Sequence, residues 1–298
     1  PNLVTLTRNG APRDAVVQMT KSAHLFVFDR DTGDPLFPID EHPVATSDIP
    51  GEETWPTQPL PRIPAPFSRQ SLTVDNITTI SPGSTRYVRD RLERMRTGAA
   101  FMPPSLEGTI ILPGLDGGGE WGGAAVDPET NVLYANASEM PWVLQLLEIP
   151  PGGDGLLATR GHRVYATHCL HCHGVDRQGD ALGVYPTLTG LAVRRAETDT
   201  RALIVDGSGY MPSHGHLGNA ELEALLAYLY DSDAPDPRAT PSMPPSDEPR
   251  FVVSGYRRFL DPDGYPAIEP PWGTLTAIDL DTGEHLWQVV HGEFTELT

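Results

Sequence analysis

The seven residues 168–174, HCLHCHG, constrain this chain more than any other stretch, because they contain both of its cysteines. Cys169 and Cys172 are separated by two residues, and His173 follows directly. In a Cys-x-x-Cys-His motif the two thiols can add to the vinyl groups of one haem, and the imidazole then reaches the iron. The motif therefore predicts a covalently attached haem c.

Two other uses of the cysteines compete with haem. Zinc could take Cys169 and Cys172 with His168, His171 or His214, but structural zinc sites usually repeat a cysteine pair, and this chain has no second pair. A redox dithiol would need a surrounding βαβ pattern, whereas this region is expected to be helical. Haem is the favoured interpretation.

A haem held by one histidine needs a sixth iron ligand. The segment GSGYMPSHGH, residues 207–216, offers Met211, His214 and His216. A thioether raises the reduction potential of the iron, which suits an electron carrier. Met211 is therefore predicted as the distal ligand, with His214 as its rival.

The segments around the motif have helical patterns. Residues 155–168 lead straight into the cysteines, and 219–231 carry leucines at helical spacing, with Asn219 as a candidate N-cap. The leucines on this predicted buried face are Leu222, Leu225, Leu226 and Leu229. Residues 232–249 then form a proline-rich linker without periodicity.

The segments at both ends of the chain have patterns typical of β-strands instead. LFVFDRDTGDPLF, from residue 25, aligns with LTAIDLDTGEHLW, from residue 275, and both contain Asp-x-x-Thr-Gly. This pattern predicts propeller hairpins in which Asp and Thr cap the turn, Gly takes a positive φ and the final aromatic packs between blades. Residues 39–107 are expected to be mostly proline-rich loop, with a helix near 85–97.

Charge and hydropathy narrow the possible partners. The net charge of −19 would repel phosphate backbones, so nucleic acid is an unfavourable partner. No apolar run is long enough to span a bilayer. Because the chain starts at Pro1, it is expected to be a mature or truncated piece. Lys21 is the one lysine among 21 basic residues, which makes it conspicuous.

Residues of about 155–231 resemble a class I cytochrome c domain. The resemblance implies that Cys169 and Cys172 form the haem thioethers, with His173 proximal and Met211 distal on the iron. It also implies three supporting positions: a loop carbonyl that holds the proximal imidazole, at Pro186, and a helix crossing through Gly161 and Tyr228.

The flanking segments resemble PQQ-dependent quinoprotein dehydrogenases of the membrane-type glucose dehydrogenase kind, where PQQ is pyrroloquinoline quinone. The residues that carry this are TKSAHLFVFDRDTGDPLFP (20–38), FMPPSLEGTIILPG (101–114), EWGGAAVDPETNVLYAN (120–136) and PPWGTLTAIDLDTGEHLW (270–287). The resemblance implies an eight-bladed propeller around PQQ and Ca²⁺.

The same resemblance implies roles for a few residues of this chain. Lys21 would contact a quinone oxygen, and Glu120 and Trp121 would approach the cofactor. The general-base Asp and most Ca²⁺ ligands are expected upstream of Pro1. Asp29 and Asp127 are expected to be turn residues.

The expected fold is mainly β: a partial eight-bladed propeller interrupted by an all-α cytochrome c domain. Because a blade takes ~40–45 residues, at most about four blades fit, and the chain is expected to be a fragment. The predicted borders are 1–152 for the first blades, 153–231 for the cytochrome, 232–249 for the linker and 250–298 for the later blades.

The predicted function is a quinohaemoprotein dehydrogenase of the periplasm. It would oxidise a sugar or alcohol at PQQ and pass electrons through haem c to an external cytochrome or oxidase. The alternative is a haem c electron-transfer or binding protein with a non-catalytic propeller scaffold. Lys21 in its TKSAHLF context separates the two, since a scaffold would not require it.

Overall fold

A computed structural model describes residues 1–98, 100–149, 160–174, 177–179, 185–209, 211–230, 250–253 and 257–294. The chain divides into two compact units. The first unit joins Pro1–Val143 with Arg258–Thr298, and the second is Leu144–Arg257. The first unit is built from strands, whereas the second contains five of the six described helices.

Two antiparallel sheets make up most of the first unit. One sheet has the order β1-β2-β3, and the other has the order β14-β13-β8-β7. The strands are β1 (Asn2–Arg8), β2 (Ala11–Met19), β3 (Leu25–Asp29), β7 (Ala125–Asp127), β8 (Val132–Ser138), β13 (Gly273–Asp279) and β14 (His285–Val290).

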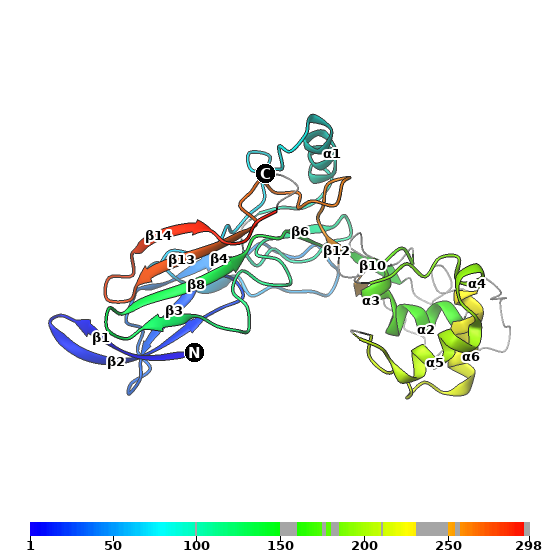
Figure 1. Cartoon of the computed structure of the whole chain (residues 1–298), viewed down its shortest axis with the longest axis horizontal. Helices are drawn as coiled ribbons and strands as arrows, with labels where there is room; N and C mark the ends of the chain where they lie inside the picture. The colour runs from blue at the N-terminus through cyan, green and yellow to red at the C-terminus, as the bar shows by residue number, and fades with distance from the viewer. Residues whose placement is uncertain are drawn as a thin grey trace. The chain divides into compact units, whose positions relative to one another are not determined.

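The four-stranded sheet joins residues from both sides of the helical unit. β8 pairs with β13 along its whole length, from Val132 opposite Asp279 to Ser138 opposite Gly273. In Figure 1 the orange β13 lies between the green β8 and the red β14. The connection between β8 and β13 therefore contains the entire second unit, which makes that unit an insertion within one sheet.

A shared hydrophobic core joins the two sheets. Val17 and Leu25 from the three-stranded sheet pack in one cluster with Leu133, Ala135 and Ile278 from the four-stranded sheet. All five side chains are fully buried. Face-to-face packing of small antiparallel sheets is the arrangement that neighbouring propeller blades require.

The two copies of the Asp-x-x-Thr-Gly turn have the same geometry, as predicted. Asp29 Oδ1 accepts from the backbone N–H groups of Asp31 (2.9 Å) and Thr32 (3.1 Å). Asp279 Oδ1 accepts from the corresponding Asp281 and Thr282 at 2.8 and 3.1 Å. The two glycines that follow the threonines take φ of +78° and +80° at Gly33 and Gly283.

The strands and aromatics after these turns differ between the copies. The second turn leads into β14, whereas the first leads only into a single bridge between Phe28 and Pro35, because proline has no N–H to donate. Phe37 is buried as expected, whereas the packing of Trp287 between blades stays a prediction. Trp287 is 42 % exposed in the described part of the chain, and its ring packs on Tyr134 of its own sheet, with centroids 5.9 Å apart.

The segment 39–107 contains more regular structure than predicted. β4 (Ile39–Pro43) and β5 (Thr57–Pro61) form a two-stranded antiparallel ribbon. Prolines are tolerated there because an isolated ribbon leaves the outer backbone positions without a strand partner.

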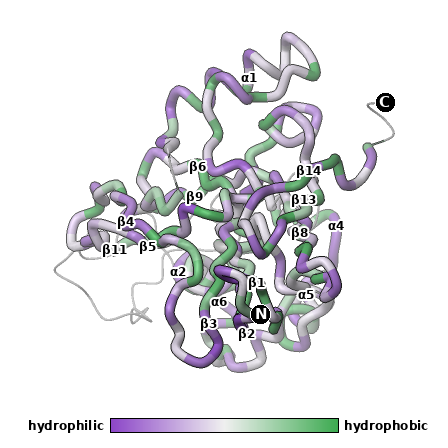
Figure 2. Tube along the Cα trace, turned by 90° about the vertical axis from the view of Figure 1, so that its left-hand side faces the viewer, coloured by the Kyte–Doolittle hydropathy of each residue, from purple (hydrophilic) through white to green (hydrophobic). Residues whose placement is uncertain are grey.

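The helix in the same segment is displaced from its predicted bounds. α1 spans Pro82–Leu92 rather than 85–97, because Ser81 caps it and Pro82 fits its first position. It ends early because the backbone of Arg96 bridges to Thr109. Most of α1 is hydrophilic (Figure 2), and only Ser84, Val88 and Leu92 are buried.

The second unit packs its helices around the predicted leucine face. Leu222, Leu225, Leu226 and Leu229 of α6 are all buried. Asn219 is the first residue of α6 and not its cap. Gly218 occupies the cap position instead, and its N–H donates to the Glu221 carboxylate at 3.1 Å. The helices are α2 (Arg160–His168), α3 (Leu170–His173), α4 (Leu191–Arg194), α5 (Glu197–Asp206) and α6 (Asn219–Leu229).

Several predicted features fall outside the described residues. These are the start of the helix predicted from 155, the border at 152 and the linker 232–249, so all three stay predictions. The remaining strands are β6 (Thr109–Ile111), β9 (Trp142–Leu144), β10 (Leu146–Ile149), β11 (Arg250–Val253) and β12 (Arg257–Arg258). Among the described helices, none has the length and apolar character needed to cross a membrane.

Candidate functional site

The two cysteines lie where α2 ends and α3 begins. The N–H of Cys169 donates to the Tyr165 carbonyl at 2.8 Å, and the Cys169 carbonyl accepts from the N–H of His173 at 3.0 Å. The short helix α3 therefore presents Cys169, Cys172 and His173 to one cavity of about 270 Å³. This is the clustering that a haem attached through two thioethers requires.

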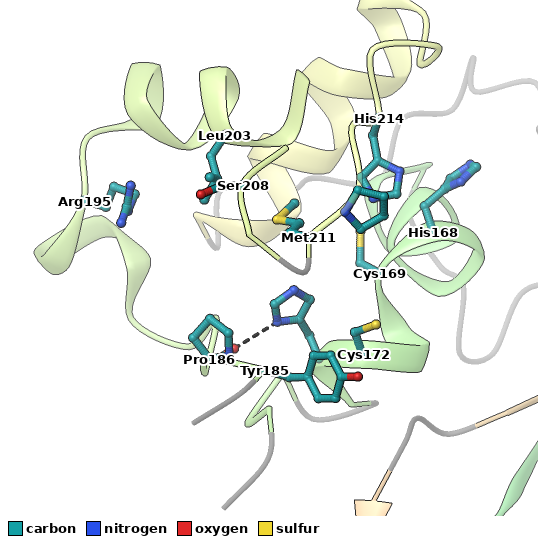
Figure 3. Close-up of a pocket in the computed structure, with 12 residues that line it drawn as sticks. His168, Cys169, Cys172, Tyr185, Pro186, Arg195, Leu203, Ser208, Met211 and His214 are labelled. Atoms are coloured by element: carbon teal, nitrogen blue, oxygen red, sulfur yellow. Dashed lines mark hydrogen bonds between the residues drawn. The ribbon is translucent and has the colours of Figure 1, made fainter. Parts of the chain in front are cut away.

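The ring of His173 has a fixed orientation. Its Nδ1 lies 2.9 Å from the carbonyl oxygen of Pro186, and His173 is only 8 % exposed. A carbonyl can only accept, so Nδ1 carries the hydrogen and donates, which leaves Nε2 as the lone-pair nitrogen. The dashed line in Figure 3 marks this contact. A carbonyl partner of this kind orients an imidazole for metal binding.

Met211 lies across the cavity from Pro186 (Figure 3). Its backbone is held by reciprocal hydrogen bonds with Ser208, at 3.0 and 2.9 Å. His214 also lines the cavity, but Figure 3 shows it to one side, beside His168. Met211 and His214 both line the cavity that contains His173, so the choice of Met211 as the distal ligand stays a prediction.

The chemistry of the thiols also fits haem better than the two alternatives. Burial raises the pKa of Cys169 to about 12 and also raises the pKa of Cys172. Redox dithiols need the opposite, a lowered thiol pKa. Among the described residues, the group of side chains close enough to share a metal ion is His168, His214 and His216, and it includes neither cysteine.

α2, which leads into the cysteines, crosses α6 in close contact. α2 carries Gly161 where α6 carries Tyr228, the pair expected from the sequence. The Tyr165 hydroxyl, also on α2, donates to the Gly174 carbonyl at 2.6 Å. This bond anchors the chain directly after the Cys-x-x-Cys-His motif.

The first unit brings Lys21, Glu120 and Trp121 to a second cavity, of about 440 Å³. Lys21 is exposed, and its Nζ donates to the Leu115 carbonyl. Trp121 is 98 % exposed, so its side chain is not packed against the described sheets. The three residues predicted for a quinone pocket therefore share one surface.

A run of glycines explains how Lys21 reaches this surface. Gly118 packs against the turn that carries Lys21: its N–H donates to the Lys21 carbonyl at 2.7 Å, and a Cβ at position 118 would lie 2.6 Å from the Cβ of Ala23. A Cβ on the next residue, Gly119, would lie 2.8 Å from the Thr20 carbonyl oxygen. Only residues without side chains allow this approach.

Asp116 is a functional candidate that sequence reasoning missed. Its carboxylate accepts from Trp142 Nε1 and lies 3.4 Å from an Arg258 nitrogen. Because Asp116 follows Leu115, these contacts fix the carbonyl that holds Lys21. No local sequence pattern predicts these contacts, since Arg258 lies 142 residues away in the sequence.

The ion pair between Arg69 and Glu139 is a second feature that sequence reasoning did not predict. Glu139 is 2 % exposed and accepts from Arg69 Nε at 3.0 Å. Burial raises the pKa of the Glu139 carboxyl, and Arg69 acts against that rise. Arg69 also donates to the carbonyls of Glu269 and Pro271, at 2.9 and 2.6 Å. The pair thus links chain segments that precede and follow the insertion.

Asp29 and Asp127 behave as turn residues, as expected. Asp127 Oδ1 accepts from the Glu129 N–H at 2.9 Å, and its Oδ2 accepts from the Thr130 hydroxyl at 2.8 Å. Both carboxyls have lowered pKa values because they accept backbone hydrogen bonds. The general-base Asp and most of the Ca²⁺ ligands stay predictions for residues upstream of Pro1.

Comparison with protein families gives two matches. Residues 1–161 and 197–298 match the family described as glucose/ethanol/alcohol dehydrogenase, beta-propeller domain, which is the PQQ family. Residues 157–229 match the family described as cytochrome c oxidase, cbb3-type, subunit III. A cytochrome c domain therefore lies in the middle of a quinoprotein propeller sequence.

Curated relatives agree with these matches. A quinoprotein glucose dehydrogenase of Escherichia coli is 27 % identical over 97 % of this chain and 27 % of its own length. A quinate/shikimate dehydrogenase (quinone) of Acinetobacter baylyi is 25 % identical over 98 % of this chain and 27 % of its own. A quinoprotein glucose dehydrogenase of Gluconobacter oxydans is 36 % identical over 51 % of this chain and 19 % of its own. The chain thus spans about a quarter of the relatives that match it throughout.

Proposed function

Because this chain belongs to the PQQ family of glucose/ethanol/alcohol dehydrogenase propellers, we propose that it is part of a quinohaemoprotein dehydrogenase. The enzyme oxidises a sugar or alcohol at PQQ and transfers the electrons to haem c, then to an external acceptor such as a cytochrome or oxidase. The observation that carries the proposal is the insertion of a cytochrome c domain between two paired strands of one propeller sheet.

The residues of the second unit suit covalent haem. Cys169 and Cys172 would form the thioethers, with His173 and Met211 as axial ligands of the iron. The Pro186 carbonyl keeps the Nδ1 hydrogen of His173 engaged and leaves Nε2 for the metal. The haem, when bound, supplies a one-electron carrier. The pairing of imidazole with thioether favours the reduced iron.

The residues of the first unit suit an anionic, electron-accepting ligand. PQQ, when bound, supplies the acceptor for the electrons of the substrate. Lys21 would place its ammonium group beside a quinone oxygen, where negative charge develops on reduction. Leu115 orients that ammonium through its carbonyl, and Glu120 and Trp121 border the same cavity. Ca²⁺ is proposed as a further cofactor, with ligands supplied by the rest of the propeller.

The insertion also explains why one polypeptide would carry both cofactors. Electrons leave the substrate in pairs, whereas a haem accepts one at a time. A covalently tethered haem has a high effective concentration at its donor and needs no encounter between separate proteins. Covalent haem attachment and the family relationship both favour the periplasm as the location.

Substrate-driven haem reduction tests this function directly. The full-length protein, produced with haem maturation and supplied with PQQ and Ca²⁺, should show the ferrous haem spectrum after addition of a sugar, quinate or another alcohol. The same sample without PQQ should show no reduction. Reduction by dithionite in every sample establishes that the haem is competent.

The alternative function predicts a different result. If the propeller is only a scaffold for a haem c electron-transfer protein, dithionite reduces the haem, but no sugar, polyol or alcohol does so at any PQQ concentration. That result would contradict the enzyme proposal and leave the cytochrome assignment intact.

A further inference from the structure

Three imidazoles cluster beside the cavity that Cys169, Cys172 and His173 line. His168 is the last residue of α2, and His214 and His216 follow Met211 in the loop before α6. Each contributes a ring nitrogen, and the three nitrogens all lie within 4.8 Å of one another. The ring centroids are 5.3 to 6.0 Å apart. The proposed haem ligation uses none of the three.

The backbone around the cluster is held in place. The N–H of His214 donates to the Ile204 carbonyl at 2.9 Å, and its carbonyl accepts from the N–H of Leu217 at 3.0 Å. His168 is followed by Cys169, whose N–H is bonded within α2. Backbone positions on two separate elements therefore face one another, which is the preorganisation that a metal site needs.

The spacing is close to that of an assembled site. In a tetrahedral site with Zn–N bonds of ~2.1 Å, the nitrogens lie about 3.4 Å apart. The present limit of 4.8 Å closes to that value if each ring nitrogen moves by less than about 1 Å, which side-chain rotation provides. His216 is exposed, so water can reach the cluster and could complete the coordination of a bound ion.

We propose that His168, His214 and His216 bind a divalent transition metal ion of the zinc and copper class. Neutral imidazoles suit both Zn²⁺ and Cu²⁺, and the net charge of −19 attracts cations to the protein. The ion joins the end of α2 to the loop that carries Met211. This site goes beyond the proposed function, because it does not require PQQ or an alcohol substrate.

The location gives the ion an effect on the haem. His168 and His214 line the cavity together with Cys169 and Met211, so a bound cation would lie at the same cavity that would hold the haem. A nearby positive charge disfavours the ferric state more than the ferrous state, which raises the reduction potential. By reciprocity, the ferrous protein binds the ion more tightly than the ferric protein.

Calorimetric titration of the haem-loaded full-length protein tests the site. The protein carries no polyhistidine tag, is stripped of metal with a chelator and is titrated first with Zn²⁺ and, in a fresh sample, with Cu²⁺. One ion per chain should bind, and His216→Gln should weaken binding by at least about tenfold, since one of three ligands is lost. His291→Gln, an exposed histidine of the first unit, should leave binding unchanged.

Further readouts distinguish this site from haem ligation. Saturation with Zn²⁺ should raise the haem potential in the parent protein and should not do so in His216→Gln. His214→Gln should weaken Zn²⁺ binding and keep the absorption band of methionine-ligated ferric haem. Failure of both ions to bind, an unaffected His216→Gln variant, an unchanged potential, or loss of that band in His214→Gln would each overturn the proposal.

Discussion

Gly161 of α2 lies directly against Tyr228 of α6. A Cβ at position 161 would stand 2.6 Å from the Tyr228 Cβ and would also clash with the Ala224 carbonyl oxygen. The closeness allows α2 and α6 to bury Val164 and Tyr165 against the leucines of α6. This crossing holds the helix that leads into the cysteines.

Gly161→Ala should therefore destabilise the helical unit by about 2 kcal/mol, because neither backbone can give way without separating the helices. Thermal unfolding followed by circular dichroism measures the change. Gly83→Ala is the matched control. Its Cβ would meet only Ser81 Oγ, at 3.7 Å, so this helical glycine should be replaceable without loss. Equal stability of the two variants would contradict the close crossing.

Gly118→Ala should impair the quinone-side chemistry while leaving the haem spectrum intact. The added methyl group would lie 2.6 Å from the Cβ of Ala23 and would push away the turn that carries Lys21. We expect weaker PQQ binding and slower substrate-driven haem reduction. Gly122→Ala, four residues further on, has nothing within 4 Å of its Cβ and should behave like the parent.

Lys21→Ala should lower the kcat/KM for substrate-driven haem reduction by about 100-fold, because a positioned cation that stabilises developing charge is lost. Lys21→Arg keeps the charge in a longer, planar group, so its kcat/KM should lie between those of the parent protein and Lys21→Ala. Arg13→Ala removes a largely exposed cation of the same unit and should have no effect. An unchanged Lys21→Ala variant would remove Lys21 from the site.

Met211→Ala should abolish the absorption band of methionine-ligated ferric haem and lower the reduction potential, since the thioether favours ferrous iron. Visible spectroscopy and a redox titration measure the two effects. A variant that keeps the band would show that another residue is the distal ligand, with His214 the first to consider.

Glu139→Ala should destabilise the first unit by about 3 kcal/mol, because it leaves the Arg69 guanidinium without its buried partner. Chemical denaturation measures this loss. The control is Asp40→Ala, which removes the carboxylate of an exposed pair with Arg62 and should leave the stability unchanged. A similar stability of both variants would show that the Arg69 pair contributes no more than a surface contact.

Local sequence patterns were enough to predict much of this molecule. The Cys-x-x-Cys-His motif and the leucine spacing of α6 depend on contacts within a few residues, and so do the Asp-x-x-Thr-Gly turns. The errors had different physical origins, one of them a local cap and another a contact between separate segments. Asn219 and the end of α1 were misplaced because Glu221 and Thr109 decide them, and proline-rich sequence concealed the ribbon of β4 and β5.

The sequence by itself determined the chemistry available to this protein: two thiols and an imidazole for haem, one lysine, and the turns of a propeller. Only the tertiary structure decided which distant groups meet. β8 pairs with β13 across the whole insertion, Pro186 holds His173, and Asp116 with Arg258 supports the loop around Lys21. Such contacts join residues that are far apart in the chain. They depend on how the folded segments pack, so no local sequence pattern can predict them.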